Sequence, residues 1–485
     1  MVRELANLTL VKPMLSRSEE SHNRQLPFPV MPITILGVGV MKQRKLSKES
    51  GMKLPKHLRY INQHAAGIDI GSRSHFVAVP EGTDEQPVRE FSTFTGDLER
   101  LAEWLGSCGV TTVAMESTGV YWIPVFEILE SHGFEVRLVN ARHVKNVPGR
   151  KSDVLDCQWL QQLHTYGLLR GAFRPVEQVC TLRAYVRQRA TLVRTSSSYV
   201  QRMQKALAQM NLQLHNVVAD ITGLTGMRII KAILAGERNP NVLAAMRDKR
   251  CKNSESTIAR SLKGHYRPEH LFSLRQAVEL YEFHQEKISD CDRQILEQLN
   301  CFDSQDAPND APPANVGEAL QRMSGVDLTS IDGIDTNTAL KILAEIGTDM
   351  SRWKTAKHFA SWLGLSPGTK VSGGKVLSSA TKPVANKAAA AFRMAAFTLF
   401  NSKSALGAYL RRQRARLGSP KAITATAHKL ARLVYAMLTV GSSYVDAGQE
   451  YYEERYRSRV VKNLKRKAHE MGFELVSSQA VTAPA

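Results

Sequence analysis

The sequence predicts an α/β domain near the N-terminus, then a long helical region, then a mainly α-helical C-terminal domain. Three observations lead to this prediction. Strand-like and helix-like stretches alternate in residues 61–175, strand signals disappear in residues 176–301, and helical patterns resume from residue 319. The chain has 485 residues, of which 43% are hydrophobic, so it is long and apolar enough to bury more than one core.

Within residues 61–175, three strand-like stretches come before an alternation of helix and strand. GIDIG, SHFVAVP and REFSTFTG predict three short strands joined by turns. The helix DLERLAEWLGSCG, the strand TTVAME, the helix YWIPVFEILESHG and the strand FEVRLVN follow, and each of these helices ends at a glycine. A last helix, SDVLDCQWLQQLHTYG, has Ser152 as its predicted N-cap. This order of elements is typical of a ribonuclease-H-like fold.

The region 176–301 contains two seams in which residues recur at gaps of three and four. The first seam begins at Val179 and is interrupted by Arg189 and Ser196, and the second begins at Leu271. Two long helices with narrow seams predict an antiparallel hairpin, an intermolecular coiled coil, or both. Packing of each helix on a globular domain of its own is the alternative.

Composition sets the other boundaries. Residues 1–60 show no sustained periodicity and predict a flexible basic extension. Residues 302–318 are rich in Pro, Asp and Asn and predict a linker. The C-terminal domain is expected over residues 319–445, and residues 446–485 form a basic tail.

The charge of the chain favours a polyanionic partner. Sixty-five Lys and Arg against forty-five Asp and Glu leave a formal net charge of +20, which suits nucleic acid first and an anionic membrane surface second. The six cysteines form no Cys-x-x-Cys pair, so a zinc ribbon and a disulfide framework are both unsupported. No apolar run approaches the roughly 18 residues that span a bilayer. These features predict a cytoplasmic protein that binds nucleic acid and no membrane.

Four carboxylates stand at informative places in the predicted α/β domain. Asp69 lies inside a strand-like apolar run, and Glu116 ends another. Asp153 and Asp156 lie three residues apart at the start of a helix, on one face. A charge in a buried strand is costly unless it is paired or binds a metal, and clustered carboxylates are the ligands that Mg²⁺ prefers. The four residues therefore predict a Mg²⁺ site, with two ions possible, of the kind used in phosphodiester chemistry.

Two further segments point to phosphate binding. LTSIDGIDTNTALKILAEIG (328–347) predicts a helix-hairpin-helix whose second helix begins at Thr336, with an ordinary helical turn as the alternative. GLSPGTKVSGGKVLSSATK (364–382) predicts a loop in which Lys370, Ser372 and Lys375 surround a Gly-Gly pair. Spacing alone favours a flexible basic loop without a covalent role, and a serine nucleophile is the alternative.

Within the basic tail, the thirteen residues 455–467 contain seven cations and no acid, and we expect these cations to contact nucleic-acid phosphates. They are Arg455, Arg457, Arg459, Lys462, Lys465, Arg466 and Lys467.

At these residues the chain resembles the DEDD transposases of insertion sequences, the one-ten family, which are bridge-RNA-guided recombinases. The resemblance is carried by GIDIG with Asp69, MESTGVYW with Glu116, and GRKSDVLDCQWL with Asp153 and Asp156. It continues in SIDGI, ALKILAEIG, LGLSPGTKVSGGK and an alanine-rich helix. The chain is long for this family.

The resemblance implies a RuvC-like domain whose four acids bind Mg²⁺, with Mn²⁺ as a possible substitute. It also implies a C-terminal domain whose loop serine, Ser372 here, attacks DNA and forms a covalent phosphoserine link. Ser378 and Ser379 follow closely and stay open as alternatives. The family further implies a bridge RNA that pairs with donor and target DNA. It implies a homo-oligomer, dimer or tetramer, in which the serine of one chain meets the acids of another.

The sequence thus predicts a DNA transposase that cuts and rejoins DNA. Two other functions stay open. One is a RuvC-like structure-selective endonuclease that uses water and forms no covalent intermediate. The other is a nucleic-acid-binding protein without catalysis. A trapped protein–DNA adduct distinguishes the first rival, and metal-dependent strand cleavage distinguishes the second.

Overall fold

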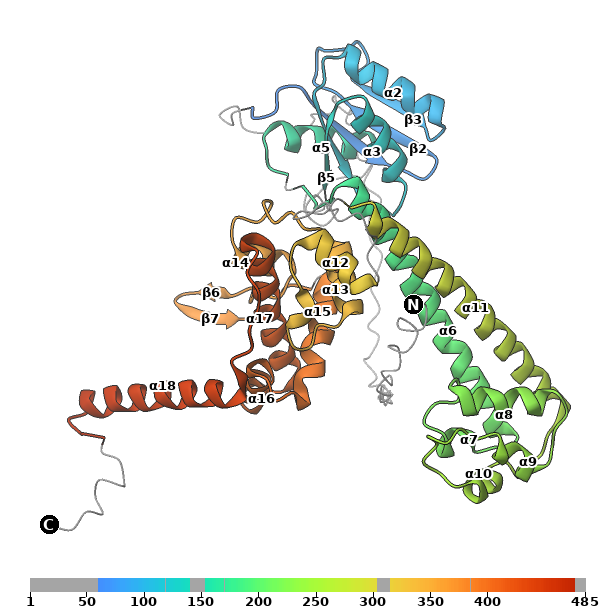
Figure 1. Cartoon of the computed structure of the whole chain (residues 1–485). Helices are drawn as coiled ribbons and strands as arrows, with labels where there is room; N and C mark the ends of the chain where they lie inside the picture. Colours follow the sequence, from blue (N-terminus) through green and yellow to red (C-terminus); the bar gives the residue numbers. More distant parts are fainter. Residues whose placement is uncertain are drawn as a thin grey trace, which may run out of the picture. The chain divides into compact units, whose positions relative to one another are not determined.

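The computed structural model describes residues 60–117, 119–139, 153–169, 171–302, 315–383 and 385–475. The chain divides between Arg174 and Pro175 into two compact units (Figure 1). Almost all of the predicted basic extension, the predicted N-cap Ser152, and the tail after residue 475 lie outside the described residues. Among the described helices, none combines the length and the apolar character needed to cross a bilayer.

The first unit is built on a five-stranded mixed sheet in the order β3-β2-β1-β4-β5. β1, β2 and β3 pair antiparallel, whereas β4 runs parallel to both β1 and β5. All five strands predicted from the sequence are confirmed. They are β1 (Ala65–Ile70), β2 (Ser74–Ala78), β3 (Val88–Ser92), β4 (Thr112–Glu116) and β5 (Glu135–Val139).

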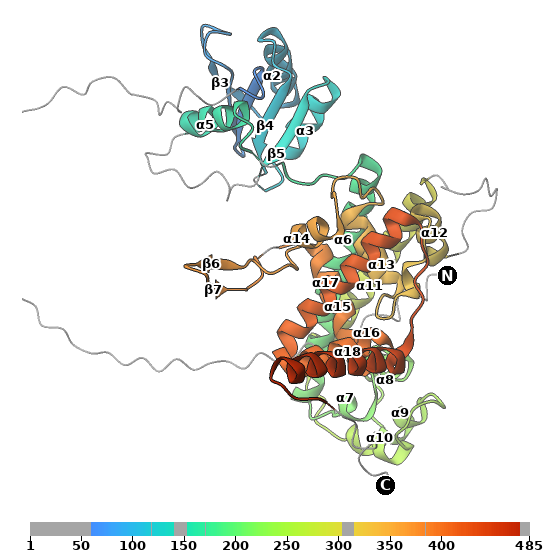
Figure 2. The same ribbon diagram turned by 90° about the vertical axis from the view of Figure 1, so that its left-hand side faces the viewer.

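Helices cover both faces of this sheet, with α5 on one side and α2 and α3 on the other (Figure 2). The predicted helices form as α2 (Thr95–Ser107), α3 (Trp122–Ser131) and α5 (Asp153–Thr165). Ile68 of β1 enters the core that α2 and α3 close. Its neighbour Gly67 points to the opposite face, as strand alternation requires, and lies against α5.

Two 33-residue helices, α6 (Glu177–Gln209) and α11 (Pro268–Asn300), begin the second unit and pack side by side (Figure 1). A small helical module, which we call the distal cap (residues 213–267), lies at one end of this pair (Figure 1). Its helices are α7 (Leu214–Val217), α8 (Leu224–Leu234), α9 (Pro240–Ala245) and α10 (Glu255–Ser261).

The polar interruptions of the two seams face each other across this pair of helices. Arg189 of α6 forms a buried ion pair with Asp292 of α11. The side-chain amide of Gln285 donates a hydrogen bond to the hydroxyl of Ser196 at 2.9 Å. These pairings fix the antiparallel register of α6 and α11 within one chain, because a buried polar group is stable only when it has a partner. An intermolecular coiled coil stays a prediction.

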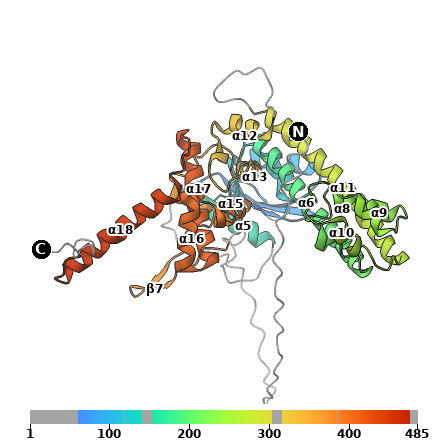
Figure 3. The same cartoon turned by 60° about the horizontal axis from the view of Figure 1, so that its bottom comes forward.

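The rest of the second unit is mainly helical. Asn315 caps α12 by accepting the N–H of Glu318 at 2.9 Å, so α12 begins inside the range predicted as a linker. The last helix, α18, extends from the others (Figure 3). The elements are α12 (Val316–Ser324), the 3-10 helix η1 (Leu328–Ser330), α13 (Thr336–Ile346), α14 (Ala356–Trp362), β6 (Lys370–Ser372), β7 (Lys375–Ser378), α15 (Lys387–Thr398), the 3-10 helix η2 (Leu399–Asn401), α16 (Ala405–Leu417), α17 (Ser419–Val440) and α18 (Gly448–Glu470).

Candidate active site

Two of the four predicted carboxylates lie at the carboxyl ends of neighbouring parallel strands. Asp69 is the fifth residue of β1, and Glu116 is the last residue of β4. Ile68 is paired with Met115 in the register of these strands, so Asp69 and Glu116 follow paired positions. Both are half-buried. The sheet therefore places the two carboxylates side by side.

A close contact between β1 and α5 directs the other two carboxylates to the same place. A Cβ on Gly67 would come within 2.3 Å of the backbone nitrogen of Gln161 and 2.5 Å of the carbonyl oxygen of Cys157. Only glycine allows this approach. The side chain of Gln161 also donates to the carbonyl of Ala65 at 3.2 Å. Because α5 runs antiparallel to β1 over this contact, its first turn lies toward the carboxyl end of the strand.

That first turn carries Asp153, which is exposed, and Asp156, which is half-buried. Burial, and then the negative charges of Asp153, Asp156 and Glu116, raise the pKa of Asp69 from 3.8 to about 6. All four carboxylates are therefore close enough for their charges to interact. The fold brings together the set that the sequence singled out.

The chemistry of this cluster suits a hard divalent cation. Carboxylate oxygens are the ligands that Mg²⁺ prefers, and a cation would relieve the repulsion that raises the pKa of Asp69. Within the described segments, however, no three His, Cys, Asp or Glu side chains converge closely enough to form a ready metal site. Binding of a metal would require the side chains of Asp69, Glu116, Asp153 and Asp156 to turn toward one point.

Cys157 lies beside this cluster, but its surroundings argue against a chemical role. It is fully buried, and its thiol donates to the carbonyl of Val154 at 3.1 Å. Burial, followed by the charge of Asp69, raises the pKa of the Cys157 thiol to about 12. The reactive thiolate is therefore disfavoured, and the residue serves the packing of α5.

The prediction of a loop over residues 364–382 is wrong in its central part, which forms the β6–β7 hairpin. Gly373 and Gly374 make the two-residue turn with φ of 54° and 75°. Two consecutive positive φ angles are what a tight hairpin turn requires, and glycine adopts them at little cost. The β-branched residues Val371 and Val376 pair across the strands.

The hairpin has two unlike faces, because cross-strand partners point to the same side. Ser372 pairs with Lys375 on one face, next to the turn, whereas Val371 and Val376 pair on the other. Ser372 and both lysines of the segment are exposed. The hydroxyl of Ser378, in contrast, is half-buried and accepts the N–H of Ala380 at 3.2 Å. Each of these serines has a lysine as its cross-strand partner, Lys375 for Ser372 and Lys370 for Ser378, and Ser372 differs in being fully exposed and next to the turn.

The cations of the tail lie on α18, which has no buried residue. The helix is anchored at its start, where Tyr452 meets Tyr409 edge to face and Gln449 accepts a hydrogen bond from Arg411 at 2.7 Å. All seven predicted cations are exposed. Within the described chain, only Arg466 among them pairs with an acid. The structure thus displays a basic helical surface.

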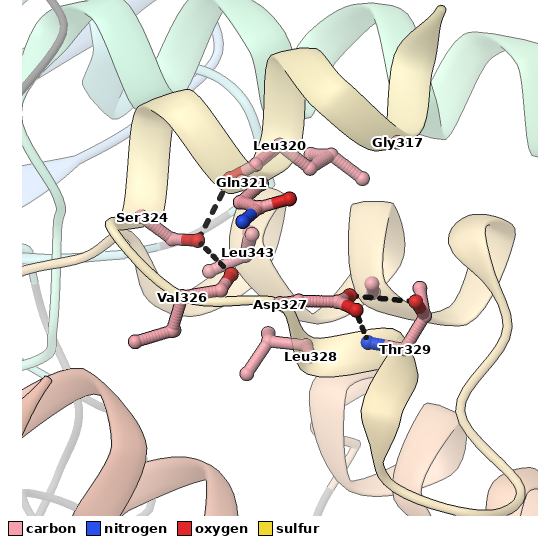
Figure 4. Close-up of a pocket in the computed structure, with 10 residues that line it drawn as sticks. Gly317, Leu320, Gln321, Ser324, Val326, Asp327, Leu328, Thr329 and Leu343 are labelled. Carbon is pink, nitrogen blue, oxygen red and sulfur yellow. Dashed lines mark hydrogen bonds between the residues drawn. The ribbon is translucent and has the colours of Figure 1, made fainter. Parts of the chain in front are cut away.

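The predicted helix-hairpin-helix segment packs against the rest of the unit. A Cβ on Gly333 would come within 2.6 Å of the carbonyl oxygen of Ala395, so this glycine allows close packing on α15. The element before the turn is the three-residue η1 rather than a full helix. Figure 4 shows the nearby hollow, in which the Ser324 hydroxyl donates to the carbonyls of Leu320 and Val326. A helix-hairpin-helix function stays a prediction.

Comparison with known proteins shows what two segments of the chain are similar to. A family model described as a transposase matches residues 66–212, which contain the four carboxylates. A second, described as the transposase IS116/IS110/IS902 family, matches residues 327–411, which contain the β6–β7 hairpin. Over these two segments, the chain is therefore similar to DEDD-type transposases.

Within that class, these two segments are similar to transposases of the IS110 family. A similar protein is the insertion element IS110 uncharacterized 43.6 kDa protein of Streptomyces coelicolor. The two are 34% identical over 119 residues, which cover 24% of this chain and 29% of the relative. The chain thus matches less than a third of that relative's length. The family resemblance seen in the sequence is confirmed.

Proposed function

We propose that this protein is a DNA transposase that cuts and rejoins phosphodiester bonds with a carboxylate site and a serine nucleophile. The observation that carries the proposal is the clustering of Asp69, Glu116, Asp153 and Asp156 at the carboxyl end of β1. The strand order, with antiparallel β1 to β3 followed by parallel β4 and β5, supports a ribonuclease-H-like (RuvC-like) domain. Similarity to two transposase family models supports the same reaction class.

The role of the four carboxylates is to hold a divalent cation and orient the scissile phosphate toward it. When bound, Mg²⁺ or Mn²⁺ would polarise the phosphate and stabilise charge on the leaving oxygen. The carboxylates must be ionised to do this, and the raised pKa of Asp69 makes that residue the one whose protonation controls binding. The close contact between β1 and α5 keeps the backbone of these residues in place while the side chains turn toward the cation.

Ser372 is the proposed nucleophile. Its hydroxyl oxygen would bond to phosphorus while the bond from phosphorus to the leaving strand oxygen breaks. The hydroxyl proton is lost to solvent or a base, and the leaving oxygen gains a proton. The phosphate remains a diester in the phosphoserine link, so rejoining needs only attack by a new strand end, which releases the serine hydroxyl. Lys375 lies on the same face and would hold the phosphate by charge.

Nucleic acid is the proposed partner of the basic surfaces. Lys370 and Lys375 on the hairpin and the seven cations of α18 are exposed and suited to phosphate contacts. The family resemblance adds a bridge RNA as guide and a homo-oligomer to the proposal. RNA that co-purifies with the protein, identified by sequencing, tests the first of these additions.

Covalent trapping tests the reaction itself. The full chain is incubated with donor and target DNA, its co-purified RNA and Mg²⁺, then denatured, and DNA linked to protein is measured. The Ser372→Ala protein should bind DNA and form no adduct, while Ser378→Ala and Ser379→Ala keep most of it. If the Ser378→Ala or Ser379→Ala protein loses the adduct instead, that serine is the nucleophile. Mg²⁺-dependent cleavage without any adduct would favour the water-using nuclease, and neither product would favour a binding protein.

A further inference from the structure

The distal cap (residues 213–267) falls between the two segments that the family models match, and the proposed chemistry gives it no role. It contains ten Lys and Arg against four Asp and Glu. Its helices enclose a core in which Ile229, Leu243 and Ile258 are fully buried. The cap is therefore a folded basic module rather than a simple connection between α6 and α11.

The four acids of the cap are all engaged within it. Asp220 and Glu237 accept hydrogen bonds from backbone N–H groups of the residues that follow them. Asp248 and Glu255 each form an ion pair with an arginine of the cap. Because these acids are committed to local structure, they leave several cations of the cap without a counter-charge.

Those cations gather near the segment between α9 and α10. Lys249 and Lys252 are exposed there, and neither forms an ion pair with a described residue. Arg228 is exposed on α8 and lies close to the same segment. Hydrogen bonds from Arg250 lower the pKa of Asp248, and Arg228 is near enough for its charge to lower that pKa further. We call Arg228, Lys249, Lys252 and the exposed Arg250, which pairs with Asp248, the basic corner.

The segment that carries the basic corner is held by hydrogen bonds at both ends. Near its start, Thr225 accepts the N–H of Asp248 at 2.9 Å. Near its end, the side-chain amide of Asn253 donates to the carbonyl of Val217 at 2.7 Å. The guanidinium of Arg247 donates to two carbonyls of the segment, at 3.3 Å each. A ligand would thus meet cations on an ordered backbone, which lowers the entropy lost on binding.

We propose that the basic corner binds the phosphate backbone of a nucleic acid and so gives the protein a contact outside its family-matched segments. The inference rests on the proposed function only in that the chain acts on nucleic acid. Phosphate contacts carry no base information, so the corner adds affinity and fixes position without selecting sequence. Duplex DNA and structured RNA share this chemistry.

The test compares two double variants of the full chain that each remove two positive charges. Lys249→Gln with Lys252→Gln removes exposed cations of the basic corner. The matched control, Lys231→Gln with Arg267→Gln, removes two cations of the cap that already pair with acids. Exposed ion pairs contribute little to stability, so both proteins should unfold at the wild-type temperature. Affinity is measured by fluorescence anisotropy against salt concentration, with a duplex DNA and with an RNA hairpin.

We expect the corner variant to lower the slope of log affinity against log salt by about 1.4 to 1.8 units, because each of the two lost phosphate contacts contributes about 0.9 on duplex DNA and 0.7 on a single strand. The control should keep the wild-type slope. A change on DNA alone or on RNA alone assigns the corner to that nucleic acid. Equal slopes for corner variant and control, with a wild-type protein that binds, would overturn the inference. A wild-type protein that binds neither probe would instead overturn the proposed function.

Discussion

The carboxylate cluster and the β6–β7 hairpin are both proposed to act on one phosphate, yet they are built in opposite ways. The cluster is half-buried and anionic, and a backbone contact at Gly67 holds it in place. The hairpin is exposed and cationic, and open space surrounds its turn glycines Gly373 and Gly374. A metal site needs several oxygens at fixed positions, whereas a nucleophile that must reach DNA needs exposure. A backbone substitution should therefore disturb the carboxylate cluster, whereas the hairpin should tolerate one and depend on its side chains.

The largest effect should come from removing one charge of the cluster. Glu116→Gln keeps the shape of the side chain but removes a proposed metal ligand, so strand cleavage should fall on the order of a thousand-fold, about 4 kcal/mol in the barrier. Glu90→Gln on β3 is the control, since Glu90 is exposed and outside the cluster. Cleavage rate is measured against Mg²⁺ concentration. Near wild-type cleavage by the Glu116 variant would exclude it from the site.

The next largest effect should come from a substitution that disturbs the backbone beside the carboxylate cluster. Gly67→Ala would force apart β1 and α5, because its Cβ meets backbone atoms at 2.3 and 2.5 Å. We expect a loss of about 3 kcal/mol in unfolding free energy, measured by denaturant titration. Gly106→Ala in α2 meets nothing within 4 Å and should be neutral or stabilising by up to about 1 kcal/mol.

The hairpin provides the contrasting glycine. Gly373→Ala also meets nothing within 4 Å, so only its positive φ of 54° costs energy, about 1 kcal/mol and confined to the turn. The global unfolding free energy should therefore fall by no more than about 1 kcal/mol. If Gly67→Ala is tolerated as well as Gly373→Ala, the contact between β1 and α5 does not determine the site.

In the hairpin, replacing the side chain of Lys375 should have a larger effect on the reaction than replacing the turn residue Gly373. Lys375→Met removes the cation beside Ser372, so adduct formation should slow by about ten- to a hundred-fold. Lys375→Arg should recover part of the rate, since the charge is restored. Lys370→Met, farther from the turn, should slow it less. Adduct rate and DNA affinity are measured separately, and equal losses for Lys370 and Lys375 would argue for general charge alone.

The sequence was sufficient to find the carboxylates because the signal was local. Asp69 and Glu116 stand in short apolar runs that could only be buried strands, and the helix after β5 carries its acids in the first turn. The glycine of the strand AAGIDIG was visible too, but its partner on α5 lies about ninety residues away. Which helix approaches a strand glycine depends on tertiary packing, so the basis of the site's geometry could not be inferred.

The hairpin and the α6–α11 pair show two other limits. β6 has only three residues, too few for a clear alternation, so the segment was predicted as a loop. The Gly-Gly pair, with a valine two residues away on each side, is the signal that could have indicated a hairpin. Arg189 and Ser196 looked like defects in a seam. They are paired with Asp292 and Gln285, and that pairing depends on the register between two helices rather than on either sequence alone.

The smallest expected effect concerns the charge of the cluster rather than its geometry. The pKa of Asp69 is about 6 in the folded protein, against about 3.9 for an unfolded chain. The folded state therefore holds more protons between about pH 4 and pH 6, and stability falls as pH rises through that window. Asp69→Asn removes the carboxyl group and with it this loss of stability at higher pH. In EDTA at pH 7.5 it should raise unfolding free energy by about 1 kcal/mol, after allowance for solvent screening of a half-exposed group, and at pH 4 by much less.

Thermal unfolding at both pH values measures the difference, and Asp84→Asn supplies a control of opposite sign. Hydrogen bonds from Trp104 and from the backbone of Gln86 lower the pKa of Asp84, so losing that carboxylate should destabilise the protein above pH 4. Mg²⁺ sharpens the test, because it should raise the melting temperature of the wild type and leave that of Asp69→Asn nearly unchanged. A variant that melts below the wild type at pH 7.5 in EDTA would mean that the four acids do not repel one another. Charge repulsion would then no longer distinguish the anionic cluster from the cationic hairpin.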